Sequence, residues 1–185
     1  WVDIQSHLDE IEKCGDDRIA IFAPYVIGYP SANSPREVIT SGAVIRLSVL
    51  KEAGLFNESY FIDSVDHEMC YRVRKLGYKI MAPTNGKLEH KIGYVTRIGN
   101  TKYHAENYSP MRYYYSTKNS IWIKKQYGHI DTDPGLYSIH AIIIRPVHRI
   151  KIIILGEKNK LRKISSIVSG FFAGLFSRPS EIEFL

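Results

Sequence analysis

The spacing of apolar side chains predicts a helix and then a buried strand at the start of the chain. Ile4, Leu8 and Ile11 recur at helical spacing, and Gly15 follows them as a stop signal. The next segment, Arg18–Gly28, is a short apolar run that closes on proline and glycine. This pattern indicates a buried strand.

Helix, glycine and strand patterns then alternate up to about residue 90. A helix is predicted over Asp66–Leu76, with Met69, Val73 and Leu76 on its apolar face and Gly77 after its end. The other predicted segments are a loop over Tyr29–Glu37, a short strand before a turn at Ser41-Gly42, a second short strand, a helix from about Ser48 to Gly54, and strands over Tyr78–Pro83 and Lys87–His90. This alternation predicts an α/β layer fold.

The pattern becomes mostly helical from about Tyr103. One long helix is predicted to start near Pro110 and to end at Gly128. Asp131–Gly135 is typical of a turn, and a mixed apolar and basic stretch follows over Ile139–Leu155. These segments predict a helical extension behind the α/β part.

The last predicted helix carries an apolar stripe. One face collects these apolar side chains: Ile164, Ile167, Val168, Phe171, Phe172, Leu175 and Phe176. The other face consists of small residues: Ser165, Ser166, Ser169, Gly170, Ala173 and Ser177. Lys158, Lys160, Arg162 and Lys163 precede the stripe, so the helix suits either an anionic membrane surface or packing on the domain's own core. No apolar run reaches the roughly 18 residues that span a bilayer.

Composition narrows the choice of partners only slightly. A net charge of +6 favours anionic partners such as phosphates, nucleotides or an anionic membrane. The 13 tyrosines suit stacking on sugars or bases, and equally plain packing. Cys14 and Cys70 have neither a disulfide-framework nor a zinc spacing, so both are expected to be reduced in the cytoplasm. The chain opens without a signal peptide and without a methionine, so it is expected to be a section of a larger protein.

Three carboxylates cluster around the start of the predicted Asp66–Leu76 helix. Asp63, Asp66 and Glu68 stand among apolar side chains. A carboxylate at a helix start is stabilised by about 0.3–1 kcal/mol, so capping explains one of them. Carboxylates beside apolar groups tend to keep a proton, which suits a general acid or base. Capping and catalysis both remain open for this cluster.

Two further features are candidates for ligand contacts. His90 follows a predicted strand, and imidazole together with carboxylates suits manganese or magnesium, although a lone histidine is more often structural. Thr40, Ser41 and Gly42 end another predicted strand. Glycine there lets backbone N–H groups approach a ligand, whereas the alternative is a plain turn.

The order of these motifs resembles the acceptor half of bacterial family 2 glycosyltransferases, in their rhamnosyltransferase-like branch. The shared pattern runs as Thr-Ser-Gly, an apolar helix ending in Gly, the pair Phe56-Asn57, Phe-Ile-Asp, Val-Asp-x-Glu, Arg, Gly-Tyr and His-x-x-Gly. It is dense over Val38–Gly93 and looser through Arg112–Ser120 to the amphipathic tail. The resemblance implies the C-terminal part of a GT-A, Rossmann-like fold. Residues 1–100 would form its acceptor side, and residues 101–185 a mostly helical C-terminal extension.

The resemblance also implies an activity. It is the inverting, metal-dependent transfer of a sugar, for instance rhamnose, from a nucleotide-diphosphate donor to a saccharide or lipid-linked acceptor. Asp66 matches the general base, and His90 matches a ligand of the divalent cation (Mn or Mg) or of the diphosphate. Inverting transfer needs a base for the acceptor hydroxyl and a cation beside the departing diphosphate. The implied substrate-binding residues are Thr40, Ser41, Gly42, Asp63 and Glu68.

Some positions depart from the family pattern. Asn57 replaces the usual Asp and Met69 the common Trp, which would change the acceptor pocket. The nucleotide-binding half, with its Asp-x-Asp motif, is expected before Trp1, so the isolated chain is expected to be inactive. Asp131–Asp133 spells that motif, but it follows the proposed base and precedes a proline turn.

Two other functions compete with the transferase. The chain could be a non-catalytic module that binds an acceptor, a membrane or a partner. A basic, tyrosine-rich segment, Lys102–Lys125, allows nucleic-acid binding, but it carries no known recognition motif, and no nucleic-acid partner is expected. The location expected for the transferase is the cytoplasm or the inner face of the cell membrane.

Overall fold

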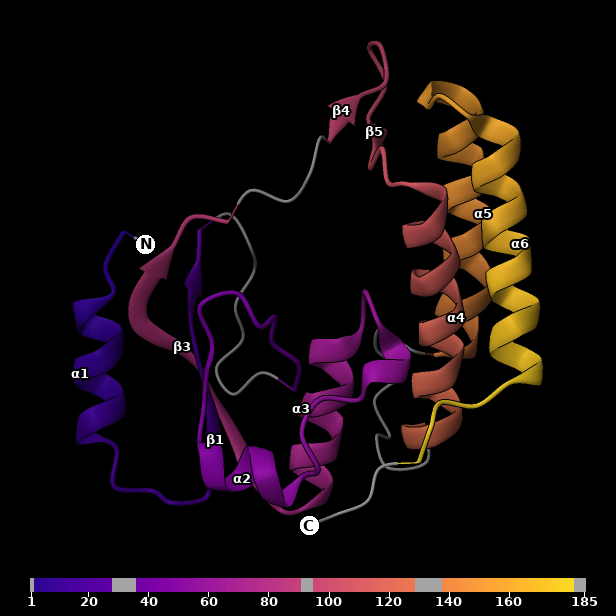
Figure 1. Ribbon diagram of the computed structural model, residues 1–185. Coiled ribbons are helices and arrows are strands. Elements are labelled where there is room, and N and C mark those ends of the chain that lie inside the picture. The colour runs from indigo at the N-terminus through magenta and orange to yellow at the C-terminus, as the bar shows by residue number, and fades with distance from the viewer. Residues whose placement is uncertain (1, 28–35, 91–94, 129–137, 182–185) are drawn as a thin grey trace. The chain divides into compact units, whose positions relative to one another are not determined.

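The computed structural model describes residues 2–27, 36–90, 95–128 and 138–181, and the chain divides into two units (Figure 1). The first, here called the sheet unit, consists of Trp1–Glu58, Val65–Lys91 and Glu181–Leu185. The second, the helical unit, consists of Ser59–Ser64 and Ile92–Ser180. Each unit has its own hydrophobic core.

The chain forms a small mixed sheet first and a set of long helices afterwards. In chain order the elements are α1 (Gln5–Lys13), β1 (Ile19–Val26), β2 (Val44–Ile45), α2 (Leu47–Glu52), the 3-10 helix η1 (Glu58–Tyr60), α3 (Val65–Lys75), β3 (Lys79–Leu88), β4 (Thr96–Arg97), β5 (His104–Ala105), α4 (Pro110–Tyr127), α5 (Ile139–Gly156) and α6 (Lys160–Phe176). The expectation of an α/β fold with C-terminal helices is confirmed at this level.

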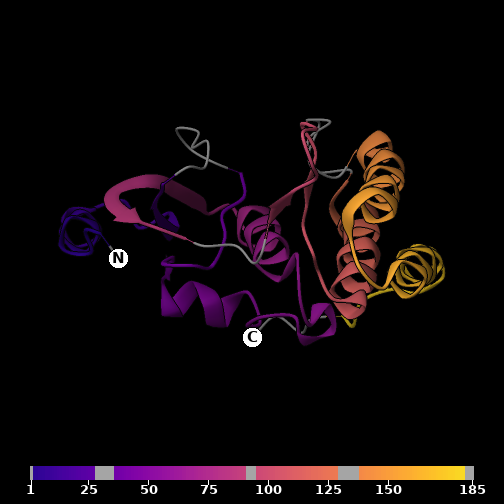
Figure 2. The same ribbon diagram turned by 90° about the horizontal axis from the view of Figure 1, so that it is seen from above.

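The sheet of the first unit has the order β2-β1-β3. β1 runs antiparallel to β2, with Ile21 opposite Ile45, and parallel to β3, with Ile19 opposite Lys79. The first six residues of β1 are all buried, because the strand is central and covered on both faces. Figures 1 and 2 show α1 on one side of β1 and β3, and α3 on the other.

The core of the sheet unit lies between β1 and the helices α2 and α3. It consists of Ala20, Ile21, Val49, Ala53, Met69, Cys70, Val73 and Ile80. Met69 and Val73 come from the predicted apolar face of α3, and both are buried. On the other side, α1 packs closely on β3, because a Cβ at Gly86 would lie 2.3 Å from the Cβ of His7.

The predicted strands differ from the structure in two places. The segments predicted as two strands around Asn85-Gly86 form the single strand β3. Gly86 therefore serves the close approach of α1 and does not end a strand. The strand predicted before Ser41-Gly42 does not form among the described residues. Instead, the Val38 N–H lies 3.5 Å from Cys70 Sγ, and the Cys70 thiol donates to the Val38 carbonyl at 3.7 Å.

The helical unit is built around α4, which follows its local signals. Ser109 Oγ accepts a hydrogen bond from the Arg112 N–H at 3.2 Å, Pro110 occupies the first turn, and Gly128 caps the end. The predicted helix from Pro110 to Gly128 is thus confirmed. The stretch over Ile139–Leu155 forms α5, which the sequence pattern did not specify.

Glycines bring α6 against α4. A Cβ on Gly170 would lie 2.4 Å from the Tyr114 carbonyl oxygen, and one on Gly174 would lie 2.9 Å from Ile121 Cβ. The core of this unit consists of Tyr113, Ile153 and Ile167, with Tyr108, Ile150 and Ile164 around it. The glycines thus allow the two helix backbones to approach closely, and Tyr113 of α4 and Ile167 of α6 pack in the same buried cluster.

The predicted apolar stripe of α6 is split in the structure. Ile167 is buried, and Ile164 and Phe171 are partly buried. Phe172 and Phe176 instead point to solvent, with 52% and 84% of their area exposed. The small-residue face includes the buried Gly170, which contacts α4. Within the described ranges, no helix has the length and apolar character needed to cross a membrane.

Candidate active site

A small pocket in the sheet unit brings together two residues predicted from the sequence, Thr40 and Asp66. The rest of its wall consists of Ile21, Val38, Ile39, Ala43, Ile45, Met69 and Cys70. The space inside it is about 10 Å³, which is room for roughly one water molecule, so the pocket as it stands does not enclose a larger ligand.

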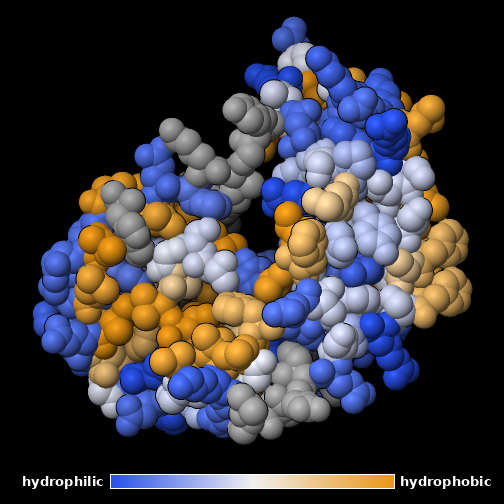
Figure 3. Space-filling model, viewed as in Figure 1, coloured by the Kyte–Doolittle hydropathy of each residue, from blue (hydrophilic) through white to orange (hydrophobic). Residues whose placement is uncertain are grey.

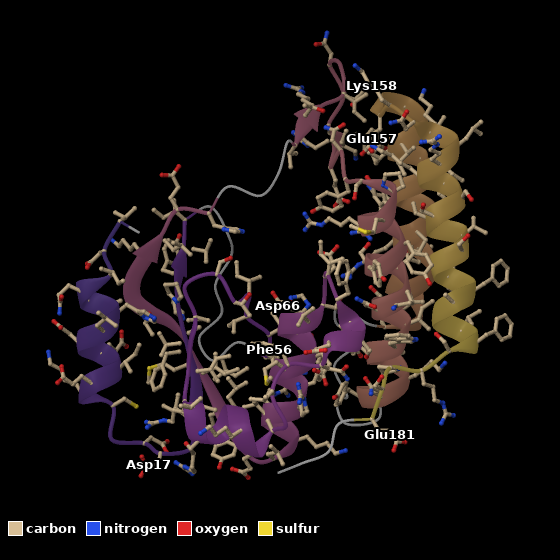
Figure 4. The ribbon with its side chains drawn as sticks, in the orientation of Figure 1. Asp17, Phe56, Asp66, Glu157, Lys158 and Glu181 are labelled. Atoms are coloured by element: carbon tan, nitrogen blue, oxygen red, sulfur yellow. The ribbon has the colours of Figure 1, made fainter. Side chains whose placement is uncertain are left out.

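Asp66 lies in the first turn of α3 (Figure 4). Its side chain is 22% exposed, and Oδ1 accepts a hydrogen bond from the His67 backbone N–H at 3.0 Å. A carboxylate in the first turn of a helix lies near the free N–H groups there, and the helix dipole favours its negative charge. The Asp66 side chain remains partly exposed.

Glu37 and His67 flank Asp66, and the sequence pattern gave no indication of them. His67 Nδ1 lies 3.5 Å from Glu37 Oε2, and its Nε2 lies 4.0 Å from Asp66 Oδ1. The Tyr71 hydroxyl donates to Glu37 Oε1 at 2.5 Å. His67 and Tyr71 are four residues apart, so both lie on the face of α3 that meets Glu37. The imidazole therefore stands between two carboxylates, one of them the predicted base.

Glu68 is buried and points away from solvent. Its Oε2 accepts a hydrogen bond from Arg72 Nη2 at 2.9 Å, and the two side chains are 1% and 2% exposed. Arg72 Nη1 also donates to the Ala53 carbonyl, at the end of α2. This buried pair fixes α3 to α2, so Glu68 supports the start of α3 from within the core.

The residues Thr40, Ser41 and Gly42 form a turn before β2. The Ala43 N–H donates to the Thr40 carbonyl at 3.0 Å, and Gly42 has a φ of 72°, a left-handed conformation that favours glycine. Thr40, at the start of this turn, lines the pocket together with Asp66.

Cys70 lines the same pocket but is not suited to nucleophilic chemistry. Burial raises the pKa of its thiol to about 12, so the reactive thiolate is not formed near neutral pH. Both Cys14 and Cys70 are free, as expected for reduced cysteines. Asp66 is the other ionisable side chain that lines this pocket.

Asp63 belongs to the helical unit, where it pairs with Arg112. Arg112 Nη2 lies 3.0 Å from Asp63 Oδ1, and its Nε lies 3.1 Å from Oδ2. The guanidinium also lies 3.9 Å from the centre of the Tyr108 ring. Phe61 and Ser64 have φ values of 57° and 64°, which are uncommon for residues with a side chain. The segment that precedes α3 is therefore held in an unusual backbone conformation.

His90 lies two residues beyond the end of β3 and is partly buried. Across the described ranges, no three histidine, cysteine or acidic side chains gather where they could hold a metal ion. Asp131–Asp133 lies outside the described residues.

Comparison with known proteins gives one distant similarity. The chain is 27% identical over 137 residues to the dTDP-rhamnosyl transferase RfbF of Shigella flexneri. The match covers 74% of this chain and 44% of that protein, so the chain spans less than half of the relative's length. No family profile matches the chain, and no solved structure matches it. The similarity supports a distant relationship to a glycosyltransferase.

Proposed function

We propose that this chain forms the acceptor side of an inverting glycosyltransferase, with Asp66 as the general base. The observation that carries the proposal is the position of Asp66, a partly exposed carboxylate at the start of α3 that shares a pocket with Thr40. The distant similarity to a rhamnosyl transferase supports the same reaction class.

The reaction is a single displacement at the donor sugar. The Asp66 carboxylate takes the proton from an acceptor hydroxyl as the hydroxyl oxygen attacks the anomeric carbon. The bond from that carbon to the diphosphate breaks on the opposite side, the nucleotide diphosphate leaves with the bonding electrons, and the configuration inverts. General base catalysis contributes about 10²–10⁴-fold to such a step.

The other predicted residues are assigned supporting roles. The Thr40–Gly42 turn contacts the sugar, and Glu68 with Arg72 keeps α3 in place under Asp66. Asp63 is proposed to act on acceptor binding. A divalent cation at His90 stays a prediction, and no step is assigned to it, because the described residues supply no cluster of metal ligands.

The donor is proposed to be a nucleotide-diphosphate sugar. The relative is named a dTDP-rhamnosyl transferase, which makes dTDP-rhamnose the first donor to test. The acceptor is proposed to be a saccharide or a lipid-linked saccharide, and the place of reaction the cytoplasmic face of the cell membrane.

The test is a transfer assay on the intact protein that contains these residues, with labelled nucleotide sugars and host membranes as acceptor source. We expect transfer with inverted configuration, measured from the anomeric signals of the product. Asp66→Asn should lower turnover by about 10²–10⁴-fold while donor binding changes little. Glu12→Gln, an exposed acid on α1, is the control. Normal turnover in Asp66→Asn would refute the assignment of the base.

A non-catalytic binding module is the competing function. It is favoured by the exposed apolar side chains of α5 and α6, which have no role in sugar transfer. Under that alternative, the intact protein would bind its partner but transfer no sugar from any donor tested.

A further inference from the structure

Two helices of the helical unit present apolar side chains to solvent. We define the outer face as the exposed apolar residues of α5 and α6. They are Ile143, Ile144, Val147, Ile154, Leu155, Leu161, Val168, Phe172, Leu175 and Phe176. Each is between 43% and 85% exposed. In Figure 3, part of this surface appears as orange and pale orange spheres along the right-hand edge. Apolar residues that gather on one face of a helix point to an interaction site, whereas scattered exposed residues need no explanation.

The outer face is distinct from the packing faces of the same helices. α6 contacts α4 through Ile167, Gly170 and Gly174, and Ile153 of α5 belongs to the core. On α6, Leu161, Val168 and Phe172 recur at spacings of seven and four residues, which places them on one side of the helix. That side lies opposite the glycines. The apolar outer face is therefore additional to what the helical unit needs for its own core.

The charges around the outer face are almost all positive. Between residues 138 and 181, the exposed cationic side chains are Lys151, Lys158, Lys160, Arg162 and Arg178. Glu157 is buried and bonded to Lys163 at 2.6 Å, which leaves Glu181 as the exposed acid among the described residues of this range. Figure 4 shows Lys158 directly after Glu157, just beyond the end of α5. Some cations make hydrogen bonds, such as Lys160 to the Ile154 carbonyl at 2.6 Å, but these acceptors do not neutralise their charge.

We propose that the outer face of α5 and α6 binds the surface of an anionic lipid bilayer, with the helices lying in the interface. Apolar side chains then enter the boundary between head groups and acyl chains, and the lysines and arginines contact anionic head groups. Phe172 and Phe176 stack with ring centres 6.3 Å apart and form the largest apolar projection of α6. This inference goes beyond the proposed transferase and does not depend on it.

Charge distinguishes a lipid surface from a second copy of the chain. Two outer faces in contact would bring two sets of exposed cations together, with one exposed acid each to offset them. An anionic bilayer offsets the charge directly, and lipid chains cover the apolar residues without requiring a matching shape. The exposed phenylalanines are also typical of interfacial helices.

The test measures binding of the full chain to vesicles by flotation, without donor or acceptor sugar. Vesicles of phosphatidylglycerol mixed with phosphatidylcholine are compared with phosphatidylcholine alone. We expect binding to the anionic vesicles that weakens with added salt. Phe172→Ser together with Phe176→Ser should weaken it by about tenfold or more for each side chain, since each removes a large apolar contact.

A matched control uses exposed apolar residues of α1. Ile4 and Leu8 are each 44% exposed, and Ile4→Ser with Leu8→Ser should leave vesicle binding unchanged. A third variant, Lys158→Gln with Lys160→Gln and Arg162→Gln, should lose the preference for anionic lipid. Circular dichroism and thermal unfolding establish that each variant is folded, and a variant that unfolds is replaced by Leu161→Ser with Val168→Ser.

The proposal is overturned if the chain does not bind anionic vesicles, if the outer-face variants bind as the unaltered chain does, or if the face instead mediates a dimer detected by sedimentation. Vesicle binding by this chain, together with no sugar transfer by the intact protein from any donor tested, would leave this proposal standing and reject the transferase.

Discussion

The guanidinium of Arg112 in α4 pairs with the carboxylate of Asp63 through two nitrogens, at 3.0 and 3.1 Å. Both side chains are partly exposed, so the pair itself contributes at most about 1 kcal/mol to stability. The pair matters more for the conformation of the loop. Asp63 has a φ of 61°, and Arg112 holds the Asp63 side chain while the backbone around Asp63 adopts left-handed conformations. The acidic residue that the sequence suggested for acceptor binding is thus also an anchor of its own loop.

Asn119 should matter more than Arg112 to the stability of this loop. Its amide nitrogen lies within 2.9 Å of three carbonyl oxygens, those of Tyr60, Ile62 and Asp63. Asn119 is fully buried, so Asn119→Ala leaves buried acceptors without a donor. We expect a loss of about 2–4 kcal/mol in the free energy of unfolding, because two or more buried hydrogen bonds are lost.

Denaturant titration measures this loss. Asn100→Ala is the control, because Asn100 is exposed and should change the free energy of unfolding by no more than about 0.5 kcal/mol. Equal effects of the two substitutions would show that the carbonyl contacts of Asn119 do not stabilise the loop.

The buried pair of Glu68 and Arg72 gives a second stability prediction. Glu68→Gln removes the negative charge and leaves the Arg72 guanidinium buried with only carbonyl partners such as that of Ala53. Breaking one side of a buried pair typically destabilises by about 3–5 kcal/mol. Replacing both residues by Met should recover part of this loss. A double variant that is less stable than Glu68→Gln would contradict the reasoning.

The helix starts and ends were predictable because their signals are local. Ser109, Pro110 and Gly128 each act within one turn of α4, so the sequence alone placed that helix correctly. Asp66 and Glu68 were likewise placed in the first turn of α3. The sheet brings Asp66 and Thr40 together. Both were named as site residues because of the resemblance to a known family, and the local pattern did not indicate that they would meet.

The errors arose where contacts between distant segments decide the structure. The stripe on α6 was assigned to one face by apolar character, but close approach to α4 selects glycine, so Gly170 turned inward and Phe172 outward. Glu37 was assigned to a loop and carried no pattern of its own. Its contact with His67 needs the fold of both segments, and nothing in their spacing along the chain indicates it.

His7 should make stability depend on pH. Burial lowers the pKa of its imidazole, while the Gly42 backbone and Glu10 oppose that shift, and Thr84 Oγ1 lies 2.6 Å from Nδ1. The fold therefore favours neutral His7. Below about pH 6.5, the unfolded chain takes up a proton that the folded chain does not, so stability falls as pH drops from about 6.5 through the lowered pKa, and is fully present above that window.

The measurement is the free energy of unfolding from pH 7.5 to pH 5 for the unaltered chain and for His7→Gln. The difference between the two curves should rise with pH over the acid part of this range and become flat above about pH 6.5. A difference that does not vary with pH would show that His7 does not titrate between the two states.

Gly170 offers the sharpest test of how α4 and α6 pack. Two effects oppose each other in Gly170→Ala. Alanine is favoured over glycine within a helix by about 1 kcal/mol, but its Cβ would lie 2.4 Å from the Tyr114 carbonyl oxygen, a backbone atom that is not free to move aside. Overpacking of this kind destabilises by about 1–3 kcal/mol or more.

We therefore expect Gly170→Ala to lower the free energy of unfolding, whereas Ser169→Ala, on an exposed position one residue earlier, should leave it unchanged or raise it slightly. If Gly170→Ala were stabilising, helix propensity would outweigh the contact, and α6 would lie farther from α4 than the structure shows.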